Sequence, residues 1–123
     1  MADPVELTVR VPAALWLTAN GRDHWATKSR RTRHLRQLGF LAARNLPAVD
    51  RANVVAVIGY PTARRADPPN SAPTVKALLD GAVDAGLLPD DDHRHVPRTS
   101  YERGPDSGER GVYLVTIRLE PLP

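Results

Sequence analysis

The sequence predicts a single α+β domain, in which one mixed β-sheet carries two main helices in the order β-α-β-α-β-β. Segments of alternating or continuous apolar residues predict the strands, and two segments with apolar residues at helical spacing separate them. No internal repeat and no long linker divides residues 1–123, a length that suits one domain with a modest core.

The first half of the chain is predicted to form a strand and then a helix. Residues 5–11 (VELTVRV) alternate apolar and polar side chains, as in a strand with one buried face. A polar loop around an Asn20-Gly turn follows. In residues 28–46, leucine and alanine repeat at helical spacing opposite a row of arginines, and Pro47 ends the helix.

The second half is predicted to contain three strands and the clearest helix of the chain. Residues 53–60 are almost continuously apolar, as in a central strand covered on both faces. Residues 74–86 have apolar side chains at helical spacing and a glycine suited to a C-terminal cap. Residues 93–101 suit an edge strand, because Pro97 excludes a central one. Residues 112–119 form the final strand.

Composition and charge exclude several classes of protein. With 41% hydrophobic and 25% charged residues, the chain has the composition of a globular, soluble domain. No apolar run approaches the roughly 18 residues that span a bilayer, so no membrane association is expected. Because cysteine is absent, disulfides and thiolate metal sites are excluded, and we expect a cytoplasmic protein. The net charge of +3 permits an anionic partner.

Acidic residues lie on both sides of the second predicted helix, around one lysine. Asp67 precedes the helix, and the run from Asp90 to Asp92 follows it. Lys76 stands in the predicted first turn, where a cation opposes the helix dipole but is well placed to hold a phosphate. If both acidic segments meet at one rim of the sheet, their carboxylates converge near Lys76 and suit Mg²⁺ or Mn²⁺. Such an ion activates water and neutralises charge on a phosphodiester.

Two simpler interpretations of these residues are open. Lys76, Asp80 and Asp84 are spaced by four, which favours an ion pair on a solvated stripe of the helix. An Asp-rich turn after a glycine cap is most often a solvated loop.

Three histidines are a further candidate metal site. His93 and His95 alternate with Arg94 and are expected on one strand face, where together with His24 they would suit Zn²⁺. A polar strand face that binds no ion is the alternative.

Basic residues flank the candidate metal ligands. They are Lys28, Arg30, Arg31, Arg33 and Arg36 near the start of the first helix, and Arg64 and Arg65 before the acidic loop. Charge runs are usually solvated faces, but beside metal ligands they fit a nucleic-acid backbone better than a small substrate. Trp16 and Trp25 are the aromatic side chains expected nearby, too few for base-specific recognition.

Residues 64–96 contain RRADPPN, Lys76, LLDGAVDAG and PDDDHRHV, in that order. This block resembles the core of the RusA-type Holliday-junction resolvases, small endonucleases of bacteria and their phages. The polar loop from Asn20 to Trp25 is similar to the loop after that family's first strand. The order of elements agrees with the family over most of the chain.

The resemblance implies a metal-dependent homodimer that cuts two symmetric strands of a four-way (Holliday) DNA junction in recombination and repair. Asp67 and Asp91 would hold Mg²⁺, or Mn²⁺ in its place, with Asp90 as a rival ligand. Lys76 would act on the scissile phosphate or the leaving oxygen. The basic residues named above would contact the DNA, together with Asn20, Arg22 and His24.

One position departs from the family's pattern. Pro69 stands where the second acid of the motif is expected, so Asn70 or Asp80 would have to replace that ligand. The departure supports an alternative function, a DNA-binding relative that has lost cleavage. A plain metal-binding or interaction domain, whose basic helix is only a solvated face, is the third interpretation.

Overall fold

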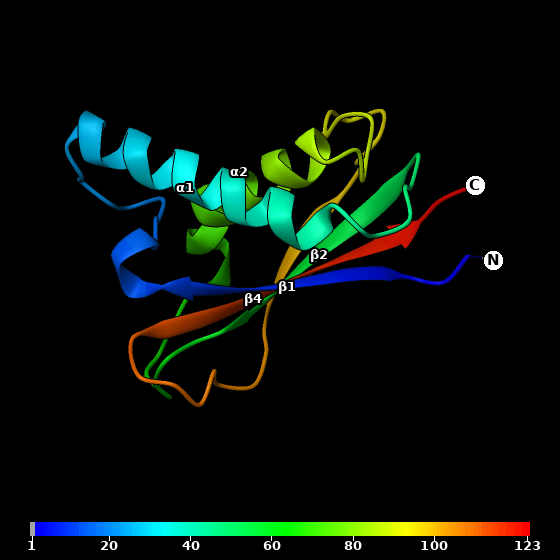
Figure 1. The fold of residues 1–123 in the computed structure, drawn as a ribbon. Helices are drawn as coiled ribbons and strands as arrows, with labels where there is room; N and C mark the ends of the chain where they lie inside the picture. The colour runs from blue at the N-terminus through cyan, green and yellow to red at the C-terminus, as the bar shows by residue number, and fades with distance from the viewer. Residues whose placement is uncertain (1) are drawn as a thin grey trace.

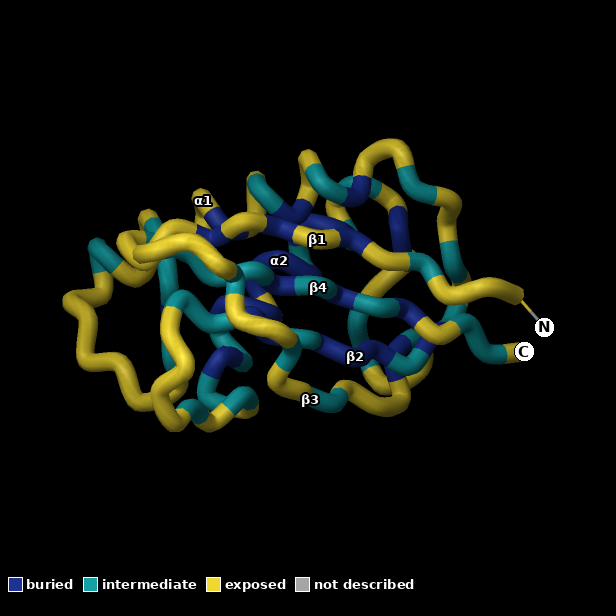
Figure 2. Tube along the Cα trace, turned by 90° about the horizontal axis from the view of Figure 1, so that it is seen from below, coloured by how far each residue is buried: buried dark blue, intermediate teal, exposed yellow. Residues whose placement is uncertain are grey.

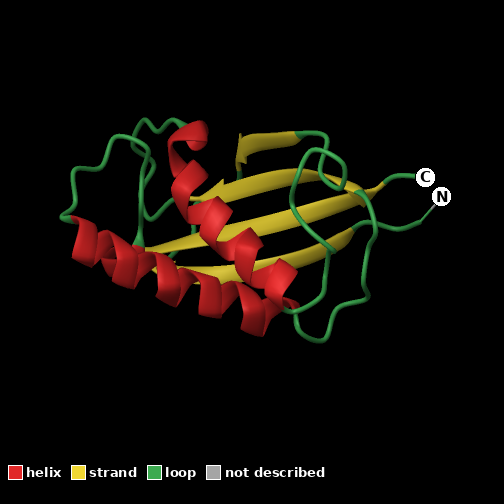
Figure 3. Ribbon diagram, turned by 90° about the horizontal axis from the view of Figure 1, so that it is seen from above, coloured by secondary structure: helices red, strands yellow, loops and turns green. Residues whose placement is uncertain are grey.

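The computed structural model describes residues 2–123, in which four strands form one mixed sheet (Figure 1). The predicted α+β fold class is therefore confirmed. Both long helices lie across the same face of the sheet (Figure 3). In chain order, the elements are β1 (Val5–Pro12), the 3₁₀ turn η1 (Ala13–Leu15), α1 (Trp25–Ala43), β2 (Ala52–Gly59), the 3₁₀ turn η2 (Pro68–Ser71), α2 (Ala72–Asp84), β3 (Thr99–Arg103) and β4 (Val112–Pro121).

The strand order brings distant parts of the chain together. The order is β1-β4-β2-β3, with β4 antiparallel to β1 and β2, and with β3 parallel to β2. A parallel pair needs a crossover connection, which the segment containing α2 supplies. The register pairs Gly59 with Leu114 and Val11 with Tyr113. The ends of β1 and β2 and the start of β4 therefore meet at one end of the sheet.

Helices cover one face of the sheet only. Val9, Ile58 and Ile117 are buried beneath them as part of the core. The predicted near-continuous burial of β2 is confirmed, but its predicted cover on both faces is wrong, because neither α1 nor α2 lies on the second face (Figure 2). On that face Val55 is nevertheless only 7% exposed, since β2 is flanked by strands on both sides, with Arg118 opposite Val55 on β4.

Both helices begin and end earlier than the sequence predicted. For α1, predicted over 28–46, the start is explained by His24, whose Nδ1 accepts a hydrogen bond from the Ala26 backbone N–H at 3.2 Å. For α2, predicted over 74–86, the early start leaves Lys76 just beyond the first turn. Gly86 follows α2 with a φ of +87°, which confirms the predicted glycine cap.

The predicted edge strand over 93–101 is only partly confirmed. β3 begins at Thr99, and the residues before it form a turn. In this turn the backbone N–H groups of His95 and Val96 donate to the Asp92 carbonyl oxygen at 3.0 and 2.8 Å. The histidines are therefore not on a strand face.

The final strand is confirmed, since β4 covers the predicted 112–119 and continues to Pro121. Among residues 2–123, neither long helix has the length and apolar character needed to cross a membrane.

α1 and α2 cross at two glycines. A Cβ atom on Gly39 would lie 2.0 Å from the Leu78 carbonyl oxygen, and one on Gly81 would lie 1.9 Å from that of Arg36. These separations are far below any van der Waals contact, so the helices approach as closely as they do only because both positions lack side chains.

Thr74 ties α2 to the loop after β1. Its side chain is fully buried, and its hydroxyl donates to the Leu17 carbonyl oxygen at 2.8 Å while accepting from the Leu17 N–H at 2.9 Å. The loop that carries Trp16 is thereby fixed against the start of α2.

Replacing Gly81 by alanine is expected to lower the free energy of unfolding by at least about 2 kcal/mol, because the new methyl group forces the helix backbones apart. Urea titration followed by circular dichroism measures the change. Gln37→Ala, at an exposed position of α1, is the control and should stay within about 0.5 kcal/mol of wild type. Alanine favours a helix more than glycine does, so helix propensity alone predicts that Gly81→Ala stabilises the protein. That result would contradict the close crossing of α1 and α2.

Candidate metal and nucleic-acid site

Lys76 lies between two carboxylates that come from different segments. Its Nζ donates to Oδ1 of Asp80 at 2.7 Å, one turn further along α2. It also donates to Oδ2 of Asp91, in the segment that follows the helix. The Lys76 side chain is 59% exposed and that of Asp91 only 17%, so the ammonium group covers a largely buried carboxylate. The structure thus brings together three of the residues that the sequence predicted for the site.

The charges of this cluster are mutually stabilised. Burial opposes the ionisation of Asp91, but the hydrogen bond and charge of Lys76 outweigh it and lower the pKa of Asp91. Burial likewise opposes the charge of Lys76, and the two carboxylates outweigh it and raise the pKa of Lys76. The pair of Lys76 and Asp91 is therefore an ammonium and a carboxylate at neutral pH.

The three consecutive aspartates have different roles. Asp92 accepts from the Arg94 guanidinium at 2.8 Å and from Nδ1 of His95 at 2.7 Å, and these hydrogen bonds, that of Arg94 first, lower the pKa of Asp92. Oδ1 of Asp90 accepts from the Asp91 backbone N–H at 2.7 Å. Asp92 thus holds the turn, and of the three it is Asp91 that the turn directs to Lys76.

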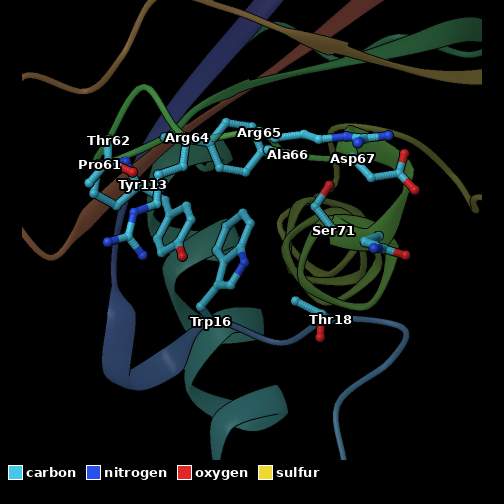
Figure 4. Close-up of a pocket in the computed structure, with 12 residues that line it drawn as sticks. Trp16, Thr18, Pro61, Thr62, Arg64, Arg65, Ala66, Asp67, Ser71 and Tyr113 are labelled. Carbon is cyan, nitrogen blue, oxygen red and sulfur yellow. The ribbon is translucent and has the colours of Figure 1, made fainter.

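Asp67 and Asn70 lie on the wall of a cavity at the end of β2, with Arg64 and Arg65 (Figure 4). Asp67 directly precedes η2, and its carbonyl oxygen accepts from the Asn70 backbone N–H at 2.9 Å. The expected convergence of Asp67 with the carboxylates beyond α2 is not seen. Within residues 2–123, no three histidine or acidic side chains stand close enough together to hold a metal ion.

The residues around Lys76 still fit a Mg²⁺ ion. Asp80 and Asp91 offer two carboxylates, and Mg²⁺ is usually held by one or two carboxylates together with water and substrate phosphate. Mn²⁺ accepts the same oxygen ligands. The predicted grouping of His24, His93 and His95 is not seen among residues 2–123, where His24 caps α1 and His95 binds Asp92.

The predicted DNA-contacting side chains of α1 fall into two groups. Lys28, Arg30 and Arg33 are exposed and form no ion pair with any described residue. Arg31 is instead paired with Asp23 at 3.2 Å. The Arg36 guanidinium binds Asp84 through two nitrogens, with Nη2 at 2.8 Å, and so links α1 to α2. Asp84 therefore does not extend the row of Lys76 and Asp80.

The loop before α1 is also exposed, including Asn20, Arg22 and His24. Trp25 follows at the first position of the helix with 76% of its surface exposed. Together with Lys28 and Arg33 it lines a shallow hollow of about 450 Å³. The predicted contact residues of this loop and of α1 thus adjoin one another on the surface.

The cavity at the end of β2 contains aromatic residues that the sequence did not predict for the site. The rings of Trp16 and Tyr113 are stacked, with centroids 3.8 Å apart and planes within 3° (Figure 4). Tyr60 meets Tyr113 edge to face at 5.9 Å, and the Arg103 guanidinium lies 4.8 Å from the Tyr60 centroid. The sequence offered one clue to this aromatic cluster: Tyr60 ends one predicted strand and Tyr113 lies at the start of another.

In comparisons with known proteins, no protein-family model and no curated protein matches the chain. Any functional assignment therefore depends on the site geometry and on the motif between residues 64 and 96.

Replacing Lys76 by methionine is expected to raise the pKa of Asp91, because burial, which opposes the charged form, remains while the lowering effect of the ammonium is lost. Titration of the side-chain carboxyl carbons by NMR measures it. Arg94→Met is the matched control, which should raise the pKa of Asp92 and leave that of Asp91 in place. An unchanged pKa of Asp91 in Lys76→Met would mean that the ion pair between Lys76 and Asp91 does not persist in solution.

Proposed function

We propose that the protein is a metal-dependent endodeoxyribonuclease that cuts branched DNA, four-way junctions above all. The observation that carries the proposal is the placement of Lys76 between Asp80 and Asp91, in a chain that also exposes basic side chains on α1. The resemblance of residues 64–96 to the RusA-type resolvases supports the same reaction. Recombination and repair in the cytoplasm would be its setting.

In this proposal, Asp80 and Asp91 hold a Mg²⁺ or Mn²⁺ ion. When bound, the ion supplies an activated water and positive charge beside the phosphodiester. Lys76 then turns its ammonium from the carboxylates to the scissile phosphate or the leaving oxygen, where charge develops. Before it turns, the two carboxylates raise the pKa of Lys76, so the side chain is already protonated when DNA arrives.

A homodimer belongs to the proposal. A four-way junction is roughly two-fold symmetric, and each chain supplies a single Lys76 cluster. Paired incisions therefore need two chains related by a two-fold axis.

A second candidate is a relative that binds branched DNA without cutting it. It is favoured by Pro69 at the expected second acid position and by the separation of Asp67 from the Lys76 cluster. Such a protein would keep the basic surface and lose the metal.

Asp91→Asn is expected to reduce nicking of a synthetic four-way junction in Mg²⁺ or Mn²⁺ by at least about 100-fold, because the amide keeps the shape but holds the ion poorly. Junction affinity without metal should persist or rise, since a negative charge beside phosphate is lost. Asp3→Asn, a neutralisation at an exposed position outside the cluster, should cut like wild type. Wild-type binding without nicking would select the second candidate, and neither binding nor nicking would overturn both.

Lys28→Ala and Arg33→Ala are each expected to flatten the salt dependence of metal-free junction binding by about one phosphate contact. Fluorescence anisotropy between about 50 and 200 mM salt gives the slope. Arg36→Ala is the matched comparison and should change the slope less, because Asp84 already binds its guanidinium. A larger change of the slope in Arg36→Ala than in Arg33→Ala would mean that the DNA contacts α1 near Arg36 and Asp84 and not near Arg33.

A further inference from the structure

The cavity at the end of β2 has the size of a small-ligand site. Its volume is about 400 Å³, toward the lower end of the range of ligand pockets. It lies where β1 and β2 end and β4 begins, so its walls come from segments far apart in the sequence. Neither the Lys76 cluster nor the basic face of α1 lines it.

One wall of the cavity is aromatic and held in place. Tyr113 covers one face of the Trp16 ring, so the other face and the ring edge are what Trp16 offers to a ligand. The hydrogen bonds between Thr74 and Leu17 fix the loop next to Trp16. A flat ring in a fixed position binds another flat ring with little loss of conformational freedom.

The facing wall is charged and polar. Arg64 and Arg65 line it, with side chains that extend to opposite sides of the cavity, and neither forms an ion pair with any residue in 2–123 (Figure 4). The Arg64 carbonyl oxygen accepts from the Arg103 guanidinium at 2.7 Å, which anchors this loop to β3. Asn70 and Asp67 add an amide and a carboxylate, groups that can pair with the donors and acceptors on a base edge.

The inner end of the cavity is less polar than this wall. Burial raises the pKa of Tyr60, against the opposing charge of Arg103, and Asp67 adds to the rise. Aromatic rings between two guanidinium groups match a base in a strand whose phosphates lie on either side of it.

We infer that the cavity receives one unstacked nucleobase of a DNA strand, with the base against Trp16 and neighbouring phosphates of the strand on Arg64 and on Arg65. The inference rests on the proposed function, which brings a DNA strand to this protein. Stacking of one base on Trp16 does not depend on which base it is, in agreement with the expectation that base-specific recognition is absent.

The test measures binding of single strands without metal. In Trp25→Phe, Trp16 is the only tryptophan left, so its fluorescence reports on the cavity. A ten-nucleotide oligothymidylate should quench it, and a backbone of the same length made of abasic nucleotides should not. The oligothymidylate should also bind about tenfold more tightly, as expected for one stacked base.

Variants show which residues cause the difference in affinity between the two strands. Trp16→Leu should bring the affinity for oligothymidylate down to that for the abasic strand, and Asp3→Asn, outside the cavity, should leave the ratio unchanged. Arg64→Ala should weaken binding of both strands alike. Because Trp16→Leu also removes packing against the core, its circular dichroism is compared first, and the two-strand comparison in Trp25→Phe holds without it.

Equal affinity and equal quenching with both strands would overturn the inference. Thymidine monophosphate binding as tightly as the oligomer would overturn the assignment to a DNA strand and indicate a site for free nucleotides. The nuclease proposal is judged separately by junction nicking. A protein that nicks the junction but binds both single strands equally would contradict only the base site. A protein that prefers the oligothymidylate but does not nick would contradict only the nuclease proposal.

Discussion

The close crossing of α1 and α2 at Gly39 and Gly81 is the constraint on which the rest of the structure depends. It seats α2 deeply enough for one side of that helix to be almost fully buried. Lys76 then projects from the remaining exposed stripe, and Thr74 reaches back to the loop after β1. The carboxylate cluster beside α2 and the aromatic cavity before it are thus positioned by the same helix contact.

Charge at the cluster is balanced within the chain. A lysine near the start of a helix opposes the helix dipole, and two acids facing each other repel. Lys76 placed between Asp80 and Asp91 offsets both costs, and the turn held by Asp92 and Arg94 keeps Asp91 in position. The gathering of acids around one lysine is therefore stable without an ion.

The sequence predicted the fold correctly wherever the spacing of apolar residues determines the secondary structure. The strands at 5–11 and 112–119 and the α2 helix with its glycine cap were predicted because burial alone specifies them. The turn before β3 was missed because a side chain, Asp92, closes it. The Lys76 cluster was predicted in part, from helical spacing. The cavity was not, because it depends on the register of β2 with β4, which no local pattern reveals.

The missing second acid changes how the proposed metal would bind. Two carboxylates that share an ammonium attract Mg²⁺ weakly, and such sites are normally completed by substrate phosphate. Lys76 must release at least one carboxylate for the ion to enter, and a DNA phosphate is the natural acceptor for the released ammonium. Metal and DNA would then each favour the binding of the other, by the same free energy in both directions. A site with Asp67 in the cluster would hold its ion without DNA; this one would assemble only on its substrate.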